Sequence, residues 1–378
     1  MRHFLACISF ALLALAAGCE QPPAVVKIGV VHPMSGTRAP LGQDMFNGVK
    51  LAADEINKAG GIKLKGKRVP IELVVGDDRA DPLVGTQVAQ QVVDAGVVAV
   101  IGHLNSGVSI PAAPVYARAN VAQLAISTNP KYTELGLPTT FRLVANDSLQ
   151  AKAIGSYAVN QMRAERWAVV DDGTPYGKGL ADSAAAELAK AKKTITLRES
   201  FDEKTVAFDD LAGKLKAGGI EGIVSTLNDY QIVALIDALK KSDYTTVSIL
   251  GTDTLKTPSI LKKAGQVSGI YCTSPILDAK EFPAGPKFLD AYKAAFKIEP
   301  AYGGHYSYDA MYVLADAIQK ADSVKPEDIV KSLRSLNGYA PVTGSMRFDD
   351  KGEQRYGSIS VYGVRNGAWE PLVRSDTW

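Results

Sequence analysis

Two short loops of small and hydroxyl-bearing residues have the composition of an anion site. Gly102–Gly107 follows the apolar run Val97–Ile101, and Ser127–Pro130 comes about twenty residues later. Hydroxyls and backbone N–H groups can bind a carboxylate, especially where a helix begins. Ser and Thr are also common N-caps, so the same residues could simply begin two helices. The pattern predicts a small-anion site or two capped helix starts.

Both loops are expected at the ends of strands in an α/β fold. Strands are predicted over 25–31, 70–75 and 97–101, and helices over 43–59, from Asp81 and from near Ser106 or Ser109. This alternation indicates a parallel sheet with helices on both faces. Ligands of open α/β sheets bind outside the carboxyl ends of the strands. The two loops would therefore line such a crevice.

The alternation begins again in the middle of the chain. Helices are predicted over 147–162, 177–191, 208–217 and 229–241, and strands over 167–170, 194–198, 220–225 and 247–250. This restart predicts a second α/β lobe, which agrees with a length of 378 residues, because domains typically have about 150 residues.

Three successive helices are expected near the C-terminus, over 284–296, 306–320 and 326–336, followed by strands over 346–348 and 359–364. Helices without strands of their own must pack on an existing sheet. We therefore expect the chain to return to the first lobe and to finish in the second. Four tyrosines are interpreted as one helix face packed on the sheet: Tyr302, Tyr306, Tyr308 and Tyr312.

The composition is that of a soluble globular protein, with 46% hydrophobic and 22% charged residues. A net charge of +2 argues against a nucleic-acid partner. The basic run Lys63–Arg68 is interpreted as a solvated turn between strands.

The N-terminus has the pattern of an export signal. Arg2 and His3 precede an apolar run over 4–17, which is too short to span a bilayer comfortably. Residues 1–18 are predicted to be a signal peptide. The run Leu15–Cys19 resembles a bacterial lipoprotein signal, in which Cys19 is lipidated and 19–25 forms a tether to the membrane. The alternative is cleavage within 14–16 and release of a soluble periplasmic protein.

The cysteines predict no intramolecular disulfide. Cys7 leaves with the signal and Cys19 is the expected anchor, so Cys272 remains alone in a strand-like run. A buried, inert thiol is expected there.

The chain shows no recognisable catalytic set. The segment Gly173–Lys178 lacks P-loop spacing, and Ser259–Lys262 matches Ser-x-x-Lys without its companion motifs. The four histidines are scattered, so neither a metal site nor a cofactor is expected. We therefore predict a protein that is not an enzyme.

Nearly the whole chain, from Ile28 to the end, resembles the periplasmic leucine/isoleucine/valine-binding proteins of bacterial ABC importers. The motifs that carry the likeness are Pro33–Gly36, Asp54–Asn57 with Gly60–Ile62, Asp77–Asp78, Gly102–Ser106, Thr128–Pro130, Tyr176–Gly179, Gly251–Asp253 and Phe348–Gly352.

The resemblance implies a type I periplasmic binding protein fold, with two lobes of parallel sheets flanked by helices and three hinge crossings. The crossings are expected near 142–145, near 273–275 and near Ser345. Lobe 1 would then comprise 26–143 and 275–345, and lobe 2 would comprise 144–274 and 346–378. Ligand would bind between the lobes, which close over it by hinge motion.

The resemblance also implies roles for individual residues. Ser106 and Thr128 match positions that hold an α-carboxylate, with backbone groups of Ile126 and Ser127 contributing. Such hydroxyls and N–H groups neutralise a carboxylate without a full positive charge.

The residues of the second lobe match the other end of an amino acid. Asp253 matches the acid that binds an α-ammonium, and Tyr176 an aromatic residue that closes the pocket. Alternatively, Asp253 begins a helix near Thr257, and Tyr176 belongs to the core or to a turn. His103 is expected to be structural rather than a ligand contact.

Departures from the family pattern concern the side-chain pocket. Leu41 replaces an aromatic residue, and Leu227 or Asn228 falls where a Tyr is usual. Ala80 and Asn105 occupy positions at which many members have a disulfide. The pocket for the ligand side chain is therefore expected to have changed.

The expected function is a monomeric receptor that captures an amino acid and delivers it to the permease of an ABC importer. Two alternatives remain open: a binding protein for amides, urea or another small metabolite, and an outer-membrane lipoprotein that contacts a cell-wall enzyme.

Overall fold

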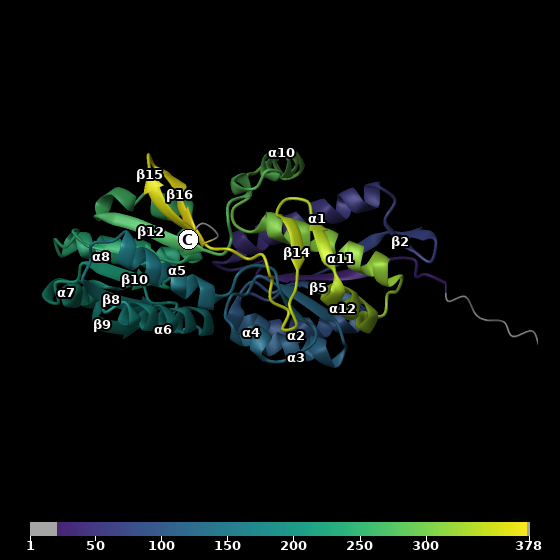
Figure 1. Cartoon of the computed structure of the whole chain (residues 1–378), viewed down its shortest axis with the longest axis horizontal. Coiled ribbons are helices and arrows are strands. Elements are labelled where there is room, and N and C mark those ends of the chain that lie inside the picture. The colour runs from purple at the N-terminus through teal and green to yellow at the C-terminus, as the bar shows by residue number, and fades with distance from the viewer. Residues whose placement is uncertain (1–20, 376–378) are drawn as a thin grey trace, which may run out of the picture.

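The computed structural model of the protein describes residues 21–375 and arranges them as two α/β lobes (Figure 1). The expected signal peptide, Cys19 and the beginning of the tether lie outside the described residues. Within the described part of the chain, no helix is long and apolar enough to cross a membrane.

Lobe 1 contains a sheet of five parallel strands in the order β4-β1-β5-β6-β7. The strands are β1 (Val26–His32), β4 (Ile71–Asp77), β5 (Ala99–Gly102), β6 (Ala122–Ala125) and β7 (Thr140–Arg142). The middle strands β5 and β6 are buried along their whole length, as the continuous apolar run before Gly102 predicts for a sheet covered on both faces.

Helices cover both faces of the lobe 1 sheet. Those from the first part of the chain are α1 (Ala39–Lys58), α2 (Pro82–Asp94), α3 (Ser106–Arg118) and the short α4 (Lys131–Glu134). Asp81 caps α2, because its carboxylate accepts from the N–H groups of Leu83 and Val84. The basic run over 63–68 lies in a hairpin of β2 (Ile62–Leu64) and β3 (Lys67–Val69).

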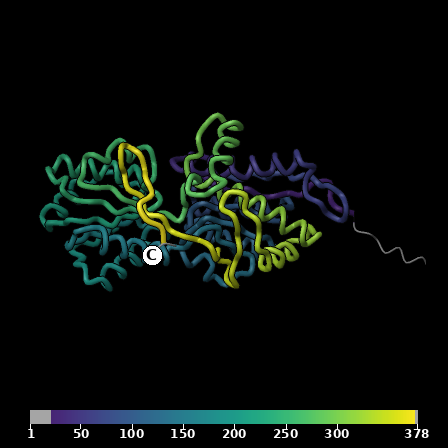
Figure 2. The backbone as a smooth tube through the Cα atoms, turned by 45° about the horizontal axis from the view of Figure 1, so that its top comes forward, coloured from purple at the N-terminus to yellow at the C-terminus, as the bar shows by residue number. Residues whose placement is uncertain are grey.

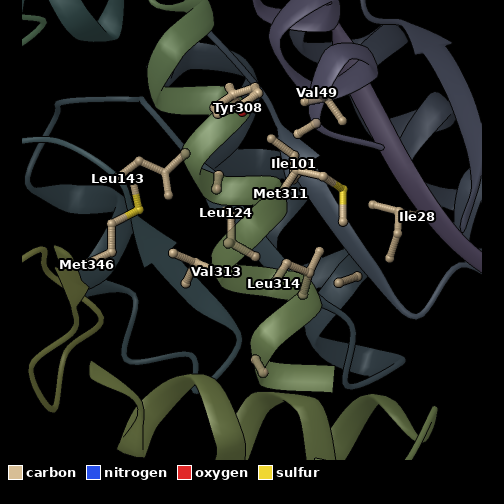
Figure 3. Close-up of a cluster of buried hydrophobic side chains, with 14 of the residues drawn as sticks. Ile28, Val49, Ile101, Leu124, Leu143, Tyr308, Met311, Val313, Leu314 and Met346 are labelled. Atoms are coloured by element: carbon tan, nitrogen blue, oxygen red, sulfur yellow. The ribbon is translucent and has the colours of Figure 1, made fainter. Parts of the chain in front are cut away.

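The C-terminal helices also pack on lobe 1. They are α10 (Gly285–Phe296), α11 (Gly304–Ala321) and α12 (Pro326–Ser335), followed by the hairpin of β13 (Asn337–Ala340) and β14 (Gly344–Arg347). Helix α11 lies against α1 and the sheet, with Met311 and Leu314 in the core beside Ile28 and Ile101 (Figure 3). The two helices touch at Gly48, where a Cβ would lie 1.9 Å from the Gly304 carbonyl oxygen.

Lobe 2 contains a seven-stranded sheet in the order β16-β15-β12-β11-β10-β8-β9. The strands are β8 (Arg166–Asp171), β9 (Thr194–Ser200), β10 (Gly222–Ser225), β11 (Ser248–Gly251), β12 (Gly269–Ser274), β15 (Ser360–Arg365) and β16 (Ala368–Arg374).

The last two strands of lobe 2 correct the expectation of a purely parallel sheet. Strand β15 pairs antiparallel with both β12 and β16. A two-residue turn at Asn366-Gly367, with both φ angles positive, joins β15 to β16. Asn-Gly is the preferred sequence for this hairpin turn, which needs no crossover helix.

The helices of lobe 2 cover the two faces of its sheet. They are α5 (Asp147–Asn160), α6 (Pro175–Lys190), α7 (Asp209–Ala217), α8 (Asp229–Lys241), the short α9 (Pro258–Leu261) and the 3₁₀ turns η1 (Asp253–Leu255) and η2 (Ala264–Gln266). Trp167 and Val169 of β8 face the cluster of α5 and α6, whereas Ala168 and Val170 face that of α7 and α8. This alternation is the period of two expected for a strand between two helix layers.

The chain passes between the lobes three times. The first passage joins β7 to α5, and the second joins β12 to the 3₁₀ turn η3 (Ala279–Glu281) before α10. We expected the third passage near Ser345, but that residue lies in β14 of lobe 1. The Gly352 carbonyl still accepts from the N–H of Arg142, and the chain enters the second sheet at β15 (Figure 2). The third passage therefore lies after Gly352 and before β15, because the chain is still hydrogen-bonded to lobe 1 at Gly352.

Candidate functional site

A cavity of about 460 Å³ lies between the lobes, at the carboxyl ends of strands from both sheets. Its position is the one expected for ligand sites in open α/β sheets. Six of the nine predicted ligand residues line it: Leu41, Ser106, Ile126, Thr128, Tyr176 and Asp253.

The lobe 1 wall of the cavity carries the hydroxyl pair. Ser106 is the first residue of α3, and its Oγ accepts a hydrogen bond of 3.3 Å from the N–H of Asn129. Thr128 lies in the loop after β6, and both residues are at most 5% exposed. The positive end of the α3 dipole and two hydroxyls suit a carboxylate at this place. The alternative of two capping hydroxyls is wrong, because Asn105 rather than Ser106 is the N-cap of α3, and Pro130 rather than Thr128 is that of α4.

Ser127 does not line the cavity. Its hydroxyl hydrogen-bonds to that of Ser109 and donates to the Leu104 carbonyl at 3.2 Å. Its carbonyl accepts from the guanidinium of Arg142. Ser127 therefore supports the loop from behind, because its polar groups are used within lobe 1.

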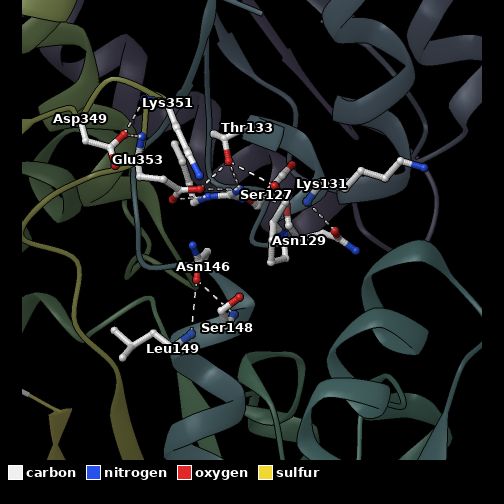
Figure 4. A network of polar contacts seen from close by, with 12 residues as sticks. Ser127, Asn129, Lys131, Thr133, Asn146, Ser148, Leu149, Asp349, Lys351 and Glu353 are labelled. Carbon is white, nitrogen blue, oxygen red and sulfur yellow. Dashed lines mark hydrogen bonds and ion pairs between the residues drawn. The ribbon is translucent and has the colours of Figure 1, made fainter. Parts of the chain in front are cut away.

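The fully buried Arg142, at the first crossing, connects the Ser127–Thr128 loop with the third crossing. Its Nη2 donates to the Asn129 carbonyl at 3.0 Å and to Thr133 Oγ1 at 3.1 Å, and its Nε donates to Glu353 Oε2 at 2.9 Å. Figure 4 shows Ser127, Thr133 and Glu353 around this network. A planar guanidinium can serve all these acceptors at once. The loop is thereby held by side chains distant in sequence.

The lobe 2 wall carries Asp253, which follows β11 at the start of η1. Its Oδ1 accepts from Tyr176 Oη at 2.8 Å and from Gln150 Nε2 at 3.2 Å, and its Oδ2 accepts from Tyr302 Oη at 2.6 Å. All three donors are neutral. Burial and the charge of Asp253 hold the pKa of both tyrosines well above the ordinary value, so they remain donors. This carboxylate can therefore attract a cation.

Asp147 is a second acid at this place, and the sequence did not single it out. It is buried at the start of α5. Burial raises its pKa to about 7, the Thr128 side chain opposes that shift, and the charge of Asp253 adds to it. Asn146 already caps α5, so Asp147 is not needed as a cap. The sequence did contain one signal for Asp147. It is an acidic residue directly after Asn146, which already caps α5, and it lies just after the first passage between the lobes.

Tyr302 is also a residue that the sequence misplaced. We expected it on a helix face with Tyr306, Tyr308 and Tyr312, but α11 begins only at Gly304. Tyr302 precedes the helix and, besides packing against the lobe 1 core, lines the cavity. Tyr306 and Tyr308 are buried in that core, and Tyr312 packs against it half-buried.

Leu227 and Asn228 do not line the cavity either. Leu227 is completely buried in the apolar core of lobe 2. Asn228 begins α8 through a capping box with Gln231, and its Nδ2 donates to Asp172 Oδ2 at 3.3 Å. Both side chains are used inside the lobe, so their positions offer the ligand nothing directly.

The cavity lining also contains charged residues. They are Arg38 of lobe 1 and Asp172, Glu203 and Asp229 of lobe 2. Burial raises the pKa of Asp172, and the charge of Arg38 opposes that shift. Two hydroxyls from the α9 region, those of Thr257 and Ser259, donate to Asp229 at 3.0 and 2.6 Å. These polar groups are therefore available to a ligand in the cavity.

The loops behind the lobe 1 wall are tied by a buried network. His103 Nδ1 lies 2.7 Å from Asp78 Oδ2, and its Nε2 lies 3.0 Å from Tyr116 Oη, so the structural role expected for His103 is confirmed. Ala80 and Asn105, on the same two loops, line the cavity.

The remaining chemistry of the described residues is sparse. Cys272 is a buried free thiol, and burial raises its pKa well above the ordinary value. Among residues 21–375, no group of three or more His, Cys, Asp or Glu side chains is placed to hold a metal ion.

Comparison with known families and proteins places the chain among solute-binding proteins. A family described as periplasmic binding protein matches residues 25–368. The Leu/Ile/Val-binding protein homolog 1 of Brucella abortus is 32% identical over 361 residues, which covers 95% of each chain.

Solved structures of similar proteins share the whole fold. The leucine-binding protein LivK of Thermotoga maritima superimposes with a TM-score of 0.81 at 26% identity, covering 94% of this chain and 100% of its own. LivJ of Streptococcus pneumoniae, a branched-chain amino acid transporter substrate-binding protein in complex with isoleucine, also has a TM-score of 0.81 at 26% identity. It covers 93% of this chain and 98% of its own.

Proposed function

The chain belongs to the periplasmic binding protein family, and on that premise we propose that it captures an amino acid and delivers it to the permease of an ABC importer. The observation that carries the proposal is the distribution of charge across one cavity. A helix start with two hydroxyls faces it from lobe 1, and a carboxylate with neutral partners faces it from lobe 2. These are complementary to the two charges of an α-amino acid.

The proposed binding mode uses both walls. Ser106 and Thr128 hold the α-carboxylate, with backbone groups of Ile126 and Thr128 contributing. Asp253 binds the α-ammonium, and Asp147 provides a second negative charge beside it. A ligand whose opposite charges are on two groups bonded to the same carbon interacts with both lobes only when they are closed. Binding therefore shifts the population toward the closed state.

A branched-chain aliphatic amino acid is the proposed ligand class. Leu41, Leu104 and Ile126 supply apolar surface to the cavity. The relatives bear names of leucine-, isoleucine- and valine-binding proteins, and LivJ was solved with isoleucine. Burial of an aliphatic side chain stabilises the complex by about 25 cal/mol per Å² of apolar surface.

The proposed location is the periplasmic face of a membrane, with a lipid on Cys19 as the anchor and the protein as a monomer. The mass of the mature N-terminus tests the anchor, because diacylglycerol on Cys19 adds a defined mass that cleavage within 14–16 does not. Light scattering of the purified chain tests the monomer. No chemical change to the ligand is expected, so mass spectrometry should recover it intact.

Calorimetry against the twenty amino acids tests the proposed function. We expect leucine, isoleucine or valine to bind, and Ser106→Ala and Asp253→Asn to weaken that binding. Ser183→Ala is a matched control, because this helical serine of lobe 2 donates to the Gly179 carbonyl and does not line the cavity. Strong binding that survives both site substitutions would contradict the site. A ligand without an amine that binds equally well to Asp253→Asn would favour the small-metabolite alternative.

A further inference from the structure

Tyr302 and Asp253 form a hydrogen bond of 2.6 Å between the two lobes. Tyr302 belongs to lobe 1, because the turn before α11 that carries it is bonded to α1. Asp253 belongs to lobe 2, directly after β11. The contact therefore exists only while the lobes are closed, and it involves the acid to which the ammonium site was assigned above.

A buried acid of lobe 1 fixes the position of Tyr302. Asp44 of α1 accepts from the N–H groups of Ala301, Tyr302 and Gly304 at 3.0, 2.9 and 2.8 Å. Tyr292 Oη adds a fourth hydrogen bond at 2.8 Å. Asp44 is 2% exposed, and three N–H groups converging on one carboxylate leave this turn little freedom. The Tyr302 ring therefore projects from a rigid support.

We propose that Tyr302 is a closure latch that links the ammonium site to the closed state, and that Asp44 is its positioning residue. The Tyr302 hydroxyl bonds one oxygen of Asp253, while Tyr176 and Gln150 of lobe 2 bond the other. Closure thus completes the hydrogen bonding of Asp253 from the opposite lobe. The part of this inference that concerns ligand affinity rests on the proposed function, whereas the part that concerns closure does not.

The latch differs from another polar contact across the cleft, that of Asn129 with Pro175. Asn129 Nδ2 donates to the Pro175 carbonyl at 2.7 Å, which joins two neutral groups. The Tyr302 bond goes to a carboxylate, and a hydrogen bond to a charged group contributes more than one between neutral groups. Loss of the Tyr302 hydroxyl should therefore shift the lobes toward the open state by about tenfold in population.

The test measures closure and binding separately, in the full chain. Spin labels on Leu83→Cys of lobe 1 and Val206→Cys of lobe 2 report the distance between the lobes, since both side chains are largely exposed. Distances are recorded without ligand and with L-isoleucine as the probe, in the presence and absence of Tyr302→Phe. Tyr312→Phe is the matched control, because the Tyr312 hydroxyl also donates to a carboxylate, that of Glu55, but within lobe 1.

The proposal predicts longer distances in ligand-free Tyr302→Phe and about a tenfold higher Kd for L-isoleucine, with the melting temperature little changed. Tyr312→Phe should alter neither distance nor Kd. Unchanged ligand-free distances in Tyr302→Phe would overturn the latch. If L-isoleucine and the other amino acids do not bind to the unsubstituted protein, the proposed function fails, but the ligand-free distances still decide the latch.

A double-mutant cycle tests the positioning role of Asp44. Asp44→Asn should weaken L-isoleucine binding in the protein with Tyr302. It should have little further effect in Tyr302→Phe, because both substitutions act on the same hydrogen bond, that between Tyr302 and Asp253. Additive losses would show that Asp44 acts on binding by another route and would overturn its assignment as the positioning residue.

Discussion

The two walls of the cleft are built in different ways. On lobe 1, Ser106 and Thr128 follow the neighbouring strands β5 and β6 and belong to one continuous stretch of chain. On lobe 2, Asp253 is surrounded by Gln150, Tyr176 and Tyr302, which come from distant segments. An anion site can be made from hydroxyls and N–H groups at a helix start, whereas a cation site needs carboxylates gathered in space. The anion site can therefore form from residues near one another in sequence, whereas the cation site depends on how the fold brings distant segments together.

The largest effect should come from substitution of Arg142. Although the lobe 1 wall is built from one stretch of chain, its loop is also held by this residue, which is bonded to Glu353. Arg142→Met leaves Glu353 without its cation and removes a donor from the Ser127–Asn129 loop. We expect a loss of about 3–5 kcal/mol in the free energy of unfolding, since the remaining charge is partly buried. Urea denaturation measures it. A loss below about 1 kcal/mol would show that the loop is held locally after all.

Asp253→Asn should produce the largest loss of affinity in the site. Removal of the charge that faces the ligand ammonium should raise the Kd by about 100-fold, because truncating one partner of a buried charged hydrogen bond costs at least 2 kcal/mol. Asp309→Asn is a matched control: this buried acid accepts from the N–H groups of Val342 and Thr343 inside lobe 1. It should lower the melting temperature without changing the Kd. If Asp309→Asn raised the Kd as much as Asp253→Asn does, the loss of affinity could not be assigned to the charge in the lobe 2 wall.

The pH dependence of binding should reveal Asp147. Its pKa of about 7 means that the ligand-free carboxyl is mostly protonated at pH 6 and ionised at pH 8. A ligand ammonium favours the ionised form, so binding releases a proton and affinity should rise about tenfold from pH 6 to 8. Asp147→Asn should abolish this rise, as calorimetry at several pH values can show. Persistence of the rise would assign it to another group.

The same shift predicts an opposite trend in the stability of the ligand-free protein. A carboxyl whose pKa is raised on folding binds more protons in the native than in the unfolded state between about pH 4 and 7. Stability should therefore fall as the pH rises through that window, and Asp147→Asn should reduce the slope. Melting temperatures without ligand at pH 5, 6 and 7 measure it. An unchanged slope would argue against an Asp147 proton in the free cleft.

Ser106→Ala should have the smallest effect of the series. One hydroxyl is lost, while Thr128 and the N–H groups at the start of α3 remain, so the Kd should rise about fivefold to tenfold, which corresponds to about 1 kcal/mol. Calorimetry with isoleucine measures it. A loss as large as that of Asp253→Asn would mean that the hydroxyl, rather than the helix start, provides most of the anion binding.

Sequence reasoning predicted the elements of the lobe 1 wall well because their signals are local. The apolar run before Gly102 and the small polar residues after it predicted a strand followed by a loop at a helix start, which β5 and α3 form. The helix predicted over 43–59 begins earlier in the structure, at Ala39, because Pro40 belongs to its first turn. The hairpin turn at Asn366-Gly367 also has a local signal, because Asn-Gly is the preferred sequence for such a turn.

Sequence reasoning failed where a residue's role depends on what another segment brings to it. Leu227 and Asn228 were placed in the pocket by position alone, yet packing turns them into the core and into a helix cap. Tyr302 was assigned to a helix face by its spacing, yet it lies in the turn before that helix, which hydrogen bonds to Asp44 hold in place.

The amino-acid sequence by itself determined the alternation of strands and helices, the polar strand ends and the family likeness, because these depend on hydrophobic periodicity and short motifs. The tertiary structure decided which carboxylates line the cleft, that Asp147 is buried near Asp253, and that Tyr302 reaches Asp253 from the other lobe. Burial and charge proximity depend on distances between segments far apart in the chain, and no local pattern encodes those distances.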